Sequence, residues 1–349
     1  MPVALRSIFV TLALTLAFLL AGELVLELRH YFKGYDTLLL GRKPTPDAAP
    51  AEAIAPTNGP TADFPFRSPI VDPNAQPETI RIWVASASYA AATDLPPAGS
   101  FANQLCDTFL EARGRPCQTL NNSAAAWTTL DNIEQLKQHG PTWKPDYAIL
   151  YEMSNDIEYY SGKYLGASAS PWNFDNGVFD AVRTALHSVA EQTSSYSHLR
   201  HYVGGSILLS SQLPDALPET AIAEFRAALL AFIDAARSVD ALPVLATFVA
   251  SHDTATAASM PVDYKFQILR YNGNLSPAGW LNAIDRLNEV IREVGKEQNV
   301  PVADLAATLE RRPEYFKDFF HFTATGHKAV AAQLGKLLSE QTATFRHGE

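Results

Sequence analysis

Three polar side chains of this 349-residue chain are of the types that carry out nucleophilic catalysis, although they lie far apart in the sequence. Ser88 stands three residues after the apolar run 80–85, and Asp318 and His321 share the run Asp-Phe-Phe-His. An aspartate that accepts a hydrogen bond from Nδ1–H orients an imidazole and leaves Nε2 free to take a serine proton. Each signal is ambiguous alone. Ser88 is also typical of a helix N-cap, Ser86 is an equal candidate nucleophile, and Asp-x-x-His also occurs in surface turns.

Two further segments offer hydrogen-bond donors for a negatively charged oxygen. Asn155-Asp156 follows the apolar run 146–151, and an asparagine amide in that position can stabilise an oxyanion. Residues 121–126 (Asn-Asn-Ser-Ala-Ala-Ala) follow the run 116–120 and offer backbone N–H groups. The competing interpretations are an Asx-turn or helix cap for the first segment and an ordinary loop of small residues for the second.

The elements that must position these residues alternate along the chain. Apolar runs predict strands at 80–85, 116–120, 146–151, 242–250 and 300–303. Helical spacing predicts helices at 101–113, 129–139, 176–192, 218–239, 281–298 and 324–338. Such alternation is typical of βαβ units and predicts a five-stranded parallel sheet inside a three-layer α/β/α sandwich. Ligands of such sheets lie beyond the carboxyl ends of the strands, which indicates residues 86–89, 121–127 and 152–156.

The order of these segments resembles the four sequence blocks of the SGNH/GDSL hydrolase family. Residues 318–327 (D-F-F-H-F-T-A-T-G-H) are similar to the last block, D-x-x-H-[LF]-T-x-x-G-H. Residues 149–156 (I-L-Y-E-M-S-N-D) resemble the strand that leads into G-x-N-D, and residues 126–136 resemble the helix after the second-block glycine. The likeness covers roughly residues 79–340 and implies the flavodoxin-like SGNH hydrolase fold.

The resemblance also implies roles for individual residues. Ser88 is implied as the nucleophile, His321 as the general base and acid, and Asp318 as the residue that orients His321. The oxyanion hole is implied to combine the backbone N–H of Ser88, the backbone N–H of Ala126 and the side-chain amide of Asn155. We expect no cofactor.

In the last block, Thr323 and His327 are implied to be structural, with Thr323 capping the following helix and His327 bracing the loop.

Three blocks depart from the family pattern. Gly-Asp-Ser is replaced by Ser86-Ala87-Ser88, the second-block glycine by Ala126, and the third-block glycine by Met153. Ala126 keeps the required N–H, so its role survives if its backbone does not need a positive φ. We expect the change at Ala87 to weaken the turn rather than the chemistry, and Met153 to line the pocket.

Composition excludes several other function classes. The net charge of −10 argues against a nucleic-acid partner. We expect no metal site, because there are only two cysteines and none of the other histidines inside the domain (His139, His187, His198, His201 and His252) lies in an H-E-x-x-H or H-x-E pattern. Cys106 and Cys117 leave two alternatives open, a disulfide in an oxidising compartment or two buried thiols.

The N-terminus predicts a membrane anchor. Residues 8–22 carry no charge, and a helix continued to residue 28 is long enough to span a bilayer. A cleaved signal peptide is the alternative, since Arg6 forms a short basic region, but the apolar run is not followed by a good small-x-small cleavage site. Charge bias leaves the orientation open. The short N-terminal tail and the family resemblance favour an extracytoplasmic domain, in a bacterial periplasm or at the cell surface.

We therefore predict four regions: a membrane anchor (1–33), a Pro/Ala-rich spacer (34–77), an SGNH hydrolase-like domain (78–342) and a C-terminal tail (343–349). Nine prolines between residues 44 and 77 indicate an extended, semi-rigid spacer. The aromatic-rich residues 159–174 are predicted to form a loop over the site.

Three hypotheses for function follow. The first is a serine esterase that cleaves short acyl or O-acetyl esters of a small molecule, lipid or glycan through an acyl-enzyme on Ser88. The second is an O-acyltransferase that uses the same three residues, with a hydroxyl of an envelope glycan in place of water. The third is a catalytically inactive binding protein that kept the fold, which the replaced motif residues would explain.

Overall fold

The computed structural model describes residues 20–28, 66–68, 71–72, 76, 78–169, 206, 209 and 212–341. The chain divides into two compact units. One comprises residues 1–56 and 171–211, and the other comprises residues 57–170 and 212–349. All the labelled helices and strands below belong to the second unit.

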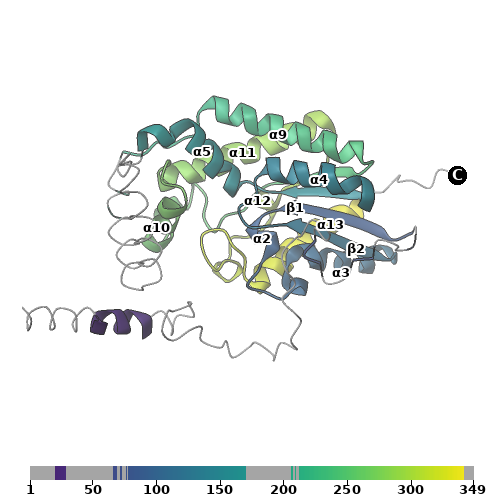
Figure 1. The fold of residues 1–349 in the computed structure, drawn as a ribbon, viewed down its shortest axis with the longest axis horizontal. Helices are drawn as coiled ribbons and strands as arrows, with labels where there is room; N and C mark the ends of the chain where they lie inside the picture. Colours follow the sequence, from purple (N-terminus) through teal and green to yellow (C-terminus); the bar gives the residue numbers. More distant parts are fainter. Residues whose placement is uncertain are drawn as a thin grey trace, which may run out of the picture. The chain divides into compact units, whose positions relative to one another are not determined.

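A five-stranded parallel sheet forms the centre of the second unit (Figure 1). Its strands are β1 (Ile80–Ser86), β2 (Cys117–Ser123), β3 (Tyr147–Tyr151), β4 (Leu242–Ala246) and β5 (Val302–Ala303), in the spatial order β2-β1-β3-β4-β5. This is the flavodoxin-like order, in which both faces of the sheet are covered. All residues of β3 are buried, which explains why such strands form continuous apolar runs in the sequence. The predicted parallel sheet is confirmed, although β4 ends four residues earlier than predicted.

Two sets of helices cover the two faces of the sheet (Figure 1). On one face α3 (Phe101–Arg113) packs against α13 (Ala324–Glu340). On the other face α9 (Glu219–Ser238) packs against both α4 (Thr129–Trp143) and α11 (Pro277–Gln298). The predicted three-layer arrangement is therefore present in the described residues.

Helix α11 shows why these segments are helical. Its buried residues include Leu281, Ile284, Leu287 and Ile291, which recur every three or four positions and face the sheet. Ser276 caps its N-terminus by accepting a hydrogen bond from the N–H of Gly279, and Pro277 occupies the first helical position, where no N–H is needed. With these start signals, α11 begins four residues before the predicted boundary at 281.

Two helices that flank the site were not predicted. Helix α5 (Ser154–Ala169) occupies most of the segment for which the sequence predicts an aromatic loop, so that prediction is wrong up to residue 169. Tyr160 is buried in the core and Tyr159 is largely exposed, as expected for one turn of a half-buried helix. Helix α10 (Val262–Tyr271) is the second. Residues 170–174 and the predicted helix 176–192 lie outside the described residues.

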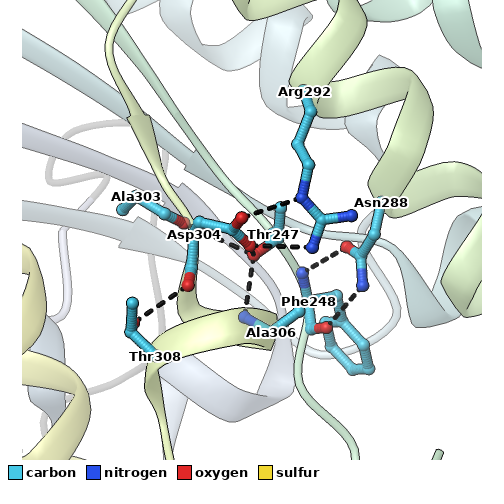
Figure 2. A network of polar contacts seen from close by, with 8 residues as sticks. All are labelled: Thr247, Phe248, Asn288, Arg292, Ala303, Asp304, Ala306 and Thr308. Atoms are coloured by element: carbon cyan, nitrogen blue, oxygen red, sulfur yellow. Dashed lines mark hydrogen bonds and ion pairs between the residues drawn. The ribbon is translucent and has the colours of Figure 1, made fainter.

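A polar network joins the carboxyl ends of β4 and β5 to α11 (Figure 2). Asn288 accepts a hydrogen bond from the N–H of Phe248 at 2.7 Å and donates one to its carbonyl oxygen at 2.9 Å. Arg292 donates twice to Asp304, each time at 2.8 Å, and Thr247 Oγ1 donates to the same carboxylate at 3.0 Å. Asn288 therefore pairs with both backbone polar groups of Phe248, which need no partner on a neighbouring strand. The chain can consequently leave the sheet after Ala246.

The folded domain includes residues upstream of its predicted start at Glu78. Phe66 is buried between Trp83 and Trp143, with ring centroids 5.2 and 4.7 Å away. Ser68 Oγ donates to the carbonyl of Thr119 at 2.6 Å, so this short segment lies along the edge strand β2. Residues 66–68 are therefore part of the domain core rather than of an extended spacer.

The predicted membrane anchor falls mostly outside the described residues. Residues 20–28 are helical. Within the part of the chain that the structure describes, no helix combines the length and apolar character that crossing a bilayer requires. Most of the predicted anchor, most of the spacer 34–77 and the tail 343–349 lie outside the described residues.

Cys106 and Cys117 form a disulfide that joins α3 to β2. Of the two alternatives that the sequence leaves open, the disulfide is the one present. The bond closes a short loop, with a sequence separation of 11.

We predict that replacing both cysteines by serine lowers the free energy of unfolding by about 3 kcal/mol, because the unfolded chain gains the entropy of the opened loop. Urea unfolding of oxidised protein, reduced protein and the Cys106→Ser/Cys117→Ser variant measures this change. The reduced protein and the variant should unfold alike. Equal stability of all three would contradict the prediction.

Candidate active site

The sheet brings three separate segments to one edge. Ser86 at the end of β1 lies level with Ser123 at the end of β2 and with Tyr151 at the end of β3. Ser88 follows β1 by two residues, and the other two strands lead into the residues predicted to supply the oxyanion donors. Segments far apart in the sequence therefore meet at the carboxyl edge of the sheet, as the fold prediction requires.

Ser88 is the first residue of the short helix α2 (Ser88–Ala91) and is half-buried. Its Oγ lies 2.9 Å from Nε2 of His321, across 233 positions of the sequence. Ser86, the competing candidate, is fully buried and donates its hydroxyl to the carbonyl oxygen of Tyr151 at 2.6 Å. The structure thus distinguishes two serines that the sequence leaves equal.

Asp318 fixes the imidazole of His321. Its Oδ2 lies 2.7 Å from Nδ1 of His321, and its Oδ1 accepts hydrogen bonds from the backbone N–H groups of Phe320 at 2.9 Å and His321 at 2.7 Å. Burial alone would raise the pKa of Asp318, but the hydrogen bond from the His321 side chain and the two backbone donors hold this pKa below its ordinary value. An ionised carboxylate only accepts, so Nδ1 carries the imidazole proton and Nε2 accepts from Ser88.

The loop that carries Asp318 and His321 is closed on itself. Phe316 and Phe322 form an antiparallel bridge at its base, and the N–H of Lys317 donates to the carbonyl of His321 at 3.0 Å. The N–H of Ser251, on the chain leaving β4, donates to the carbonyl of Phe319 at 2.9 Å. Backbone contacts from both sides therefore hold the imidazole toward Ser88.

Thr323 caps the helix that follows this loop, as predicted. Its Oγ1 accepts from the N–H of Gly326 at 3.2 Å and donates to the carbonyl of Glu314 at 2.6 Å. A Cβ on Gly326 would lie 2.2 Å from the carbonyl oxygen of Tyr315, so only glycine permits this close approach.

Two backbone donors of the predicted oxyanion hole lack an acceptor within the described part of the chain. Among the described residues, neither the N–H of Ser88 nor that of Ala126 donates to a backbone carbonyl. Both residues are at least partly exposed, so solvent or a ligand can take these hydrogen bonds.

Ala126 has the left-handed conformation that favours glycine, with φ of 64°. From the sequence, the role of Ala126 is conditional on a backbone that does not need a positive φ. The backbone does adopt one, and Ala126 tolerates it at a cost of about 1 kcal/mol. The N–H direction that a glycine would give is therefore kept at the expense of local strain.

The third donor, the side chain of Asn155, is held on three sides. Its Nδ2 donates to the carbonyl of Trp127 at 2.8 Å, and its Oδ1 accepts the hydroxyl of Tyr271. Its backbone N–H donates to Glu152 Oε1 at 3.0 Å. Because Nδ2 carries two hydrogens, one remains for an oxyanion.

Asp156 has a different task from its neighbour Asn155. It is fully buried and accepts from the N–H and the hydroxyl of Thr129, at 2.9 and 2.6 Å. Burial raises its pKa to about 7, and the two bonds from Thr129 oppose that rise. Asp156 thus ties the start of α5 to the start of α4, next to the loop that carries Ala126.

Helix α2 is secured at its C-terminal end. Its N-cap residue, Ala87, makes no side-chain cap. Arg67 instead donates to the carbonyl of Ala91, the last residue of α2, and to that of Leu95 at 2.8 Å. A cation at this end of a helix is favoured by the helix dipole. Arg67 lies in the proline-rich segment, and no signal in the sequence links it to the site.

Glu152 and Tyr271 were also missed. Glu152 stands directly after a buried strand and three residues before Asn155, and an ionisable residue in that position is a signal that could have found it. Tyr271 ends a helix that was not predicted.

No group of three or more His, Cys, Asp or Glu side chains among the described residues is arranged to hold a metal ion.

His327 is buried and neutral, in the bracing role predicted for it. Its Nδ1 accepts the N–H of Phe101 at 3.2 Å, and the two rings stack with centroids 5.8 Å apart. Burial lowers the pKa of His327 to about 4.

The low pKa of His327 predicts acid sensitivity. The imidazole of His327 binds a proton below about pH 6.5 in the unfolded chain but only below about pH 4 in the folded chain. The free energy of unfolding therefore decreases as the pH falls through this range. Between pH 7 and pH 4 the native protein should lose about 3 kcal/mol more than His327→Gln, whose amide oxygen can still accept from Phe101. Urea unfolding at both pH values measures this difference, and parallel pH profiles of the two proteins would contradict it.

The strain at Ala126 gives a second prediction. Ala126→Gly should raise the free energy of unfolding by about 0.5–1 kcal/mol, because glycine adopts a positive φ without strain. Ala124→Gly is the matched control, because Ala124 has no positive φ. That variant should be destabilised by a similar amount through the entropy of the unfolded chain. Thermal unfolding compares the two, and equal destabilisation of both would show that position 126 is unstrained.

Comparison with known proteins supplies the family. Similar solved structures include a lipase/acylhydrolase from Enterococcus faecalis (18% identity, TM-score 0.42, covering 74% of this chain and 95% of that chain). A GDSL-like lipase from Bacteroides thetaiotaomicron is 11% identical, with a TM-score of 0.40 and coverage of 73% of this chain and 86% of that chain. No curated protein sequence matches the chain. The model of the GDSL-like lipase/acylhydrolase family matches residues 87–329, which is more than half of the chain, and the chain belongs to that family.

Proposed function

We propose that the chain is a serine esterase that hydrolyses short acyl or O-acetyl esters through an acyl-enzyme on Ser88. One observation carries the proposal: the continuous hydrogen-bonded series from Ser88 Oγ to His321 Nε2 (2.9 Å) and from His321 Nδ1 to Asp318 Oδ2 (2.7 Å). A binding protein that had lost catalysis would not need this alignment. The series therefore supports an enzyme over the inactive alternative.

Acylation begins with attack of Ser88 Oγ on the ester carbonyl carbon. His321 Nε2 takes the hydroxyl proton as the new C–O bond forms, and Asp318 stabilises the resulting imidazolium. The tetrahedral intermediate then expels the alcohol, which receives that proton from His321. The products of this half-reaction are a free alcohol and an acyl group esterified to Ser88.

The negative charge of the intermediate falls on the former carbonyl oxygen. The N–H groups of Ser88 and Ala126 and the remaining amide hydrogen of Asn155 are the donors proposed for it. Preorganised donors of this kind lower the barrier because they do not have to reorient as the charge develops.

Deacylation needs water at the same imidazole. The side chains of His321 and Asp318 are about a quarter exposed, at 25% and 26%, so solvent lies beside this pair. A water molecule gives its proton to His321 and its oxygen to the acyl carbon. Ser88 then leaves with that proton, and the carboxylic acid is released.

The proposed setting is outside the cytoplasm, with residues 1–33 as the anchor and an ester of a small molecule, lipid or glycan as the substrate. The Cys106–Cys117 disulfide supports this setting, because such bonds persist in oxidising compartments such as the bacterial periplasm or cell surface.

Replacing the nucleophile tests the proposal. Ser88→Ala should lower kcat for p-nitrophenyl acetate by at least about 1,000-fold, because no acyl-enzyme can form. Ser86→Ala is the matched control, because Ser86 is buried two residues away and bonds only a backbone carbonyl. That variant should keep kcat within a few-fold of the native value. Native activity in Ser88→Ala would rule out the assignment.

A further inference from the structure

A buried polar pair lies directly behind the proposed nucleophile, and the chemistry described above does not use it. Tyr89 and Glu152 are each only 1% exposed. Tyr89 follows Ser88 in α2, and Glu152 follows β3 three residues before Asn155. The hydroxyl of Tyr89 donates to Oε2 of Glu152.

The same two side chains hold the backbone on the oxyanion side of the site. The second carboxyl oxygen of Glu152, Oε1, accepts the N–H of Asn155 at 3.0 Å. The hydroxyl oxygen of Tyr89 accepts the N–H of Met153 at 3.3 Å. One buried unit therefore connects the neighbour of Ser88 to the backbone of the residue that offers the oxyanion amide.

Aromatic packing prevents this pair from shifting freely. The ring of Tyr89 makes edge contacts with Tyr151, Phe248 and Phe320, at centroid distances of 5.4, 5.3 and 6.0 Å. The imidazole of His321 lies 6.5 Å from the same ring. Movement of Tyr89 would consequently disturb the ring layer beneath His321 as well as α2.

Stability alone does not account for a polar pair at this position. Burial raises the pKa of Glu152 well above its ordinary range and does the same for Tyr89. Burying a carboxyl group is costly, and this cost offsets much of the stability that the hydrogen bonds of the pair contribute. The distinctive property of the pair is directional: it fixes where α2 and residues 152–155 lie relative to each other.

We propose that Tyr89 and Glu152 are positioning residues that set the distance between Ser88 Oγ and the Asn155 amide. The inference rests on the proposed function. The amide meets the oxyanion only in the transition state, so loss of this positioning should lower kcat and leave KM nearly unchanged. Tyr271 and Trp127 orient the amide side chain, whereas the Tyr89–Glu152 pair fixes the backbone that carries it.

Tyr89→Phe in the full chain tests the proposal by removing one hydroxyl. We expect kcat for p-nitrophenyl acetate to fall about 10- to 100-fold, with KM within about 2-fold of the native value. Tyr147→Phe is the matched control, because Tyr147 is equally buried but lies at the opposite end of β3. It should keep the native kcat.

A double variant separates positioning from stability. Tyr89→Phe/Glu152→Gln carries no buried carboxyl and keeps an oxygen that accepts the N–H of Asn155, so its thermal unfolding temperature should exceed that of Tyr89→Phe, while its kcat stays low. Recovery of kcat together with stability would overturn the proposal, because the pair would then be only structural.

Ser88→Ala, measured alongside, distinguishes failure of the proposed function from failure of the positioning role. Native activity in Ser88→Ala would remove the proposed function itself. Loss of activity in Ser88→Ala with a native kcat in Tyr89→Phe would overturn only the positioning role.

Discussion

Parallel pairing of β1 with β2 on one side and with β3 on the other is the constraint on which the site depends. The pairing brings Ser86, Ser123 and Tyr151 level at the carboxyl edge of the sheet. A nucleophile, an oxyanion loop and an amide donor can therefore follow the three strands after only a few residues each. The closed loop around His321 then needs to supply only an imidazole, and Ser251 on the chain leaving β4 holds that loop in place.

The structure accommodates each departure from the family motifs through the backbone conformation or the contacts at that position. Ala126 keeps the left-handed backbone of a glycine, with φ of 64°, and so keeps its N–H available. Helix α2 lacks a side-chain cap at its start, and Arg67 holds the opposite end. Met153 is buried, and its backbone N–H bonds to Tyr89. The proposed site thus tolerates small strains because neighbouring elements fix its geometry.

The sheet and the triad candidates were predictable because their signals are local or follow the order of the family blocks. Strands buried on both faces form apolar runs, and Asp318-Phe-Phe-His321 is a compact motif. The position of Arg67 was not predictable, because its contacts arise only when residues 66–68 pack along β2. The positive φ of Ala126 was equally unpredictable, because alanine is not a residue type that indicates a positive φ. Helix α5 was not predicted, because a stretch rich in aromatic residues after a strand is also typical of a loop that overhangs a site.

The central claim is that Ser88 is an activated nucleophile, and covalent labelling tests it most directly. The full chain would be treated with a fluorophosphonate, and the modified residue would be located by mass spectrometry of its peptides. The account predicts a single adduct on Ser88, formed far more slowly when His321 is replaced by alanine. An adduct on another serine, or an unmodified Ser88 in folded protein, would contradict it.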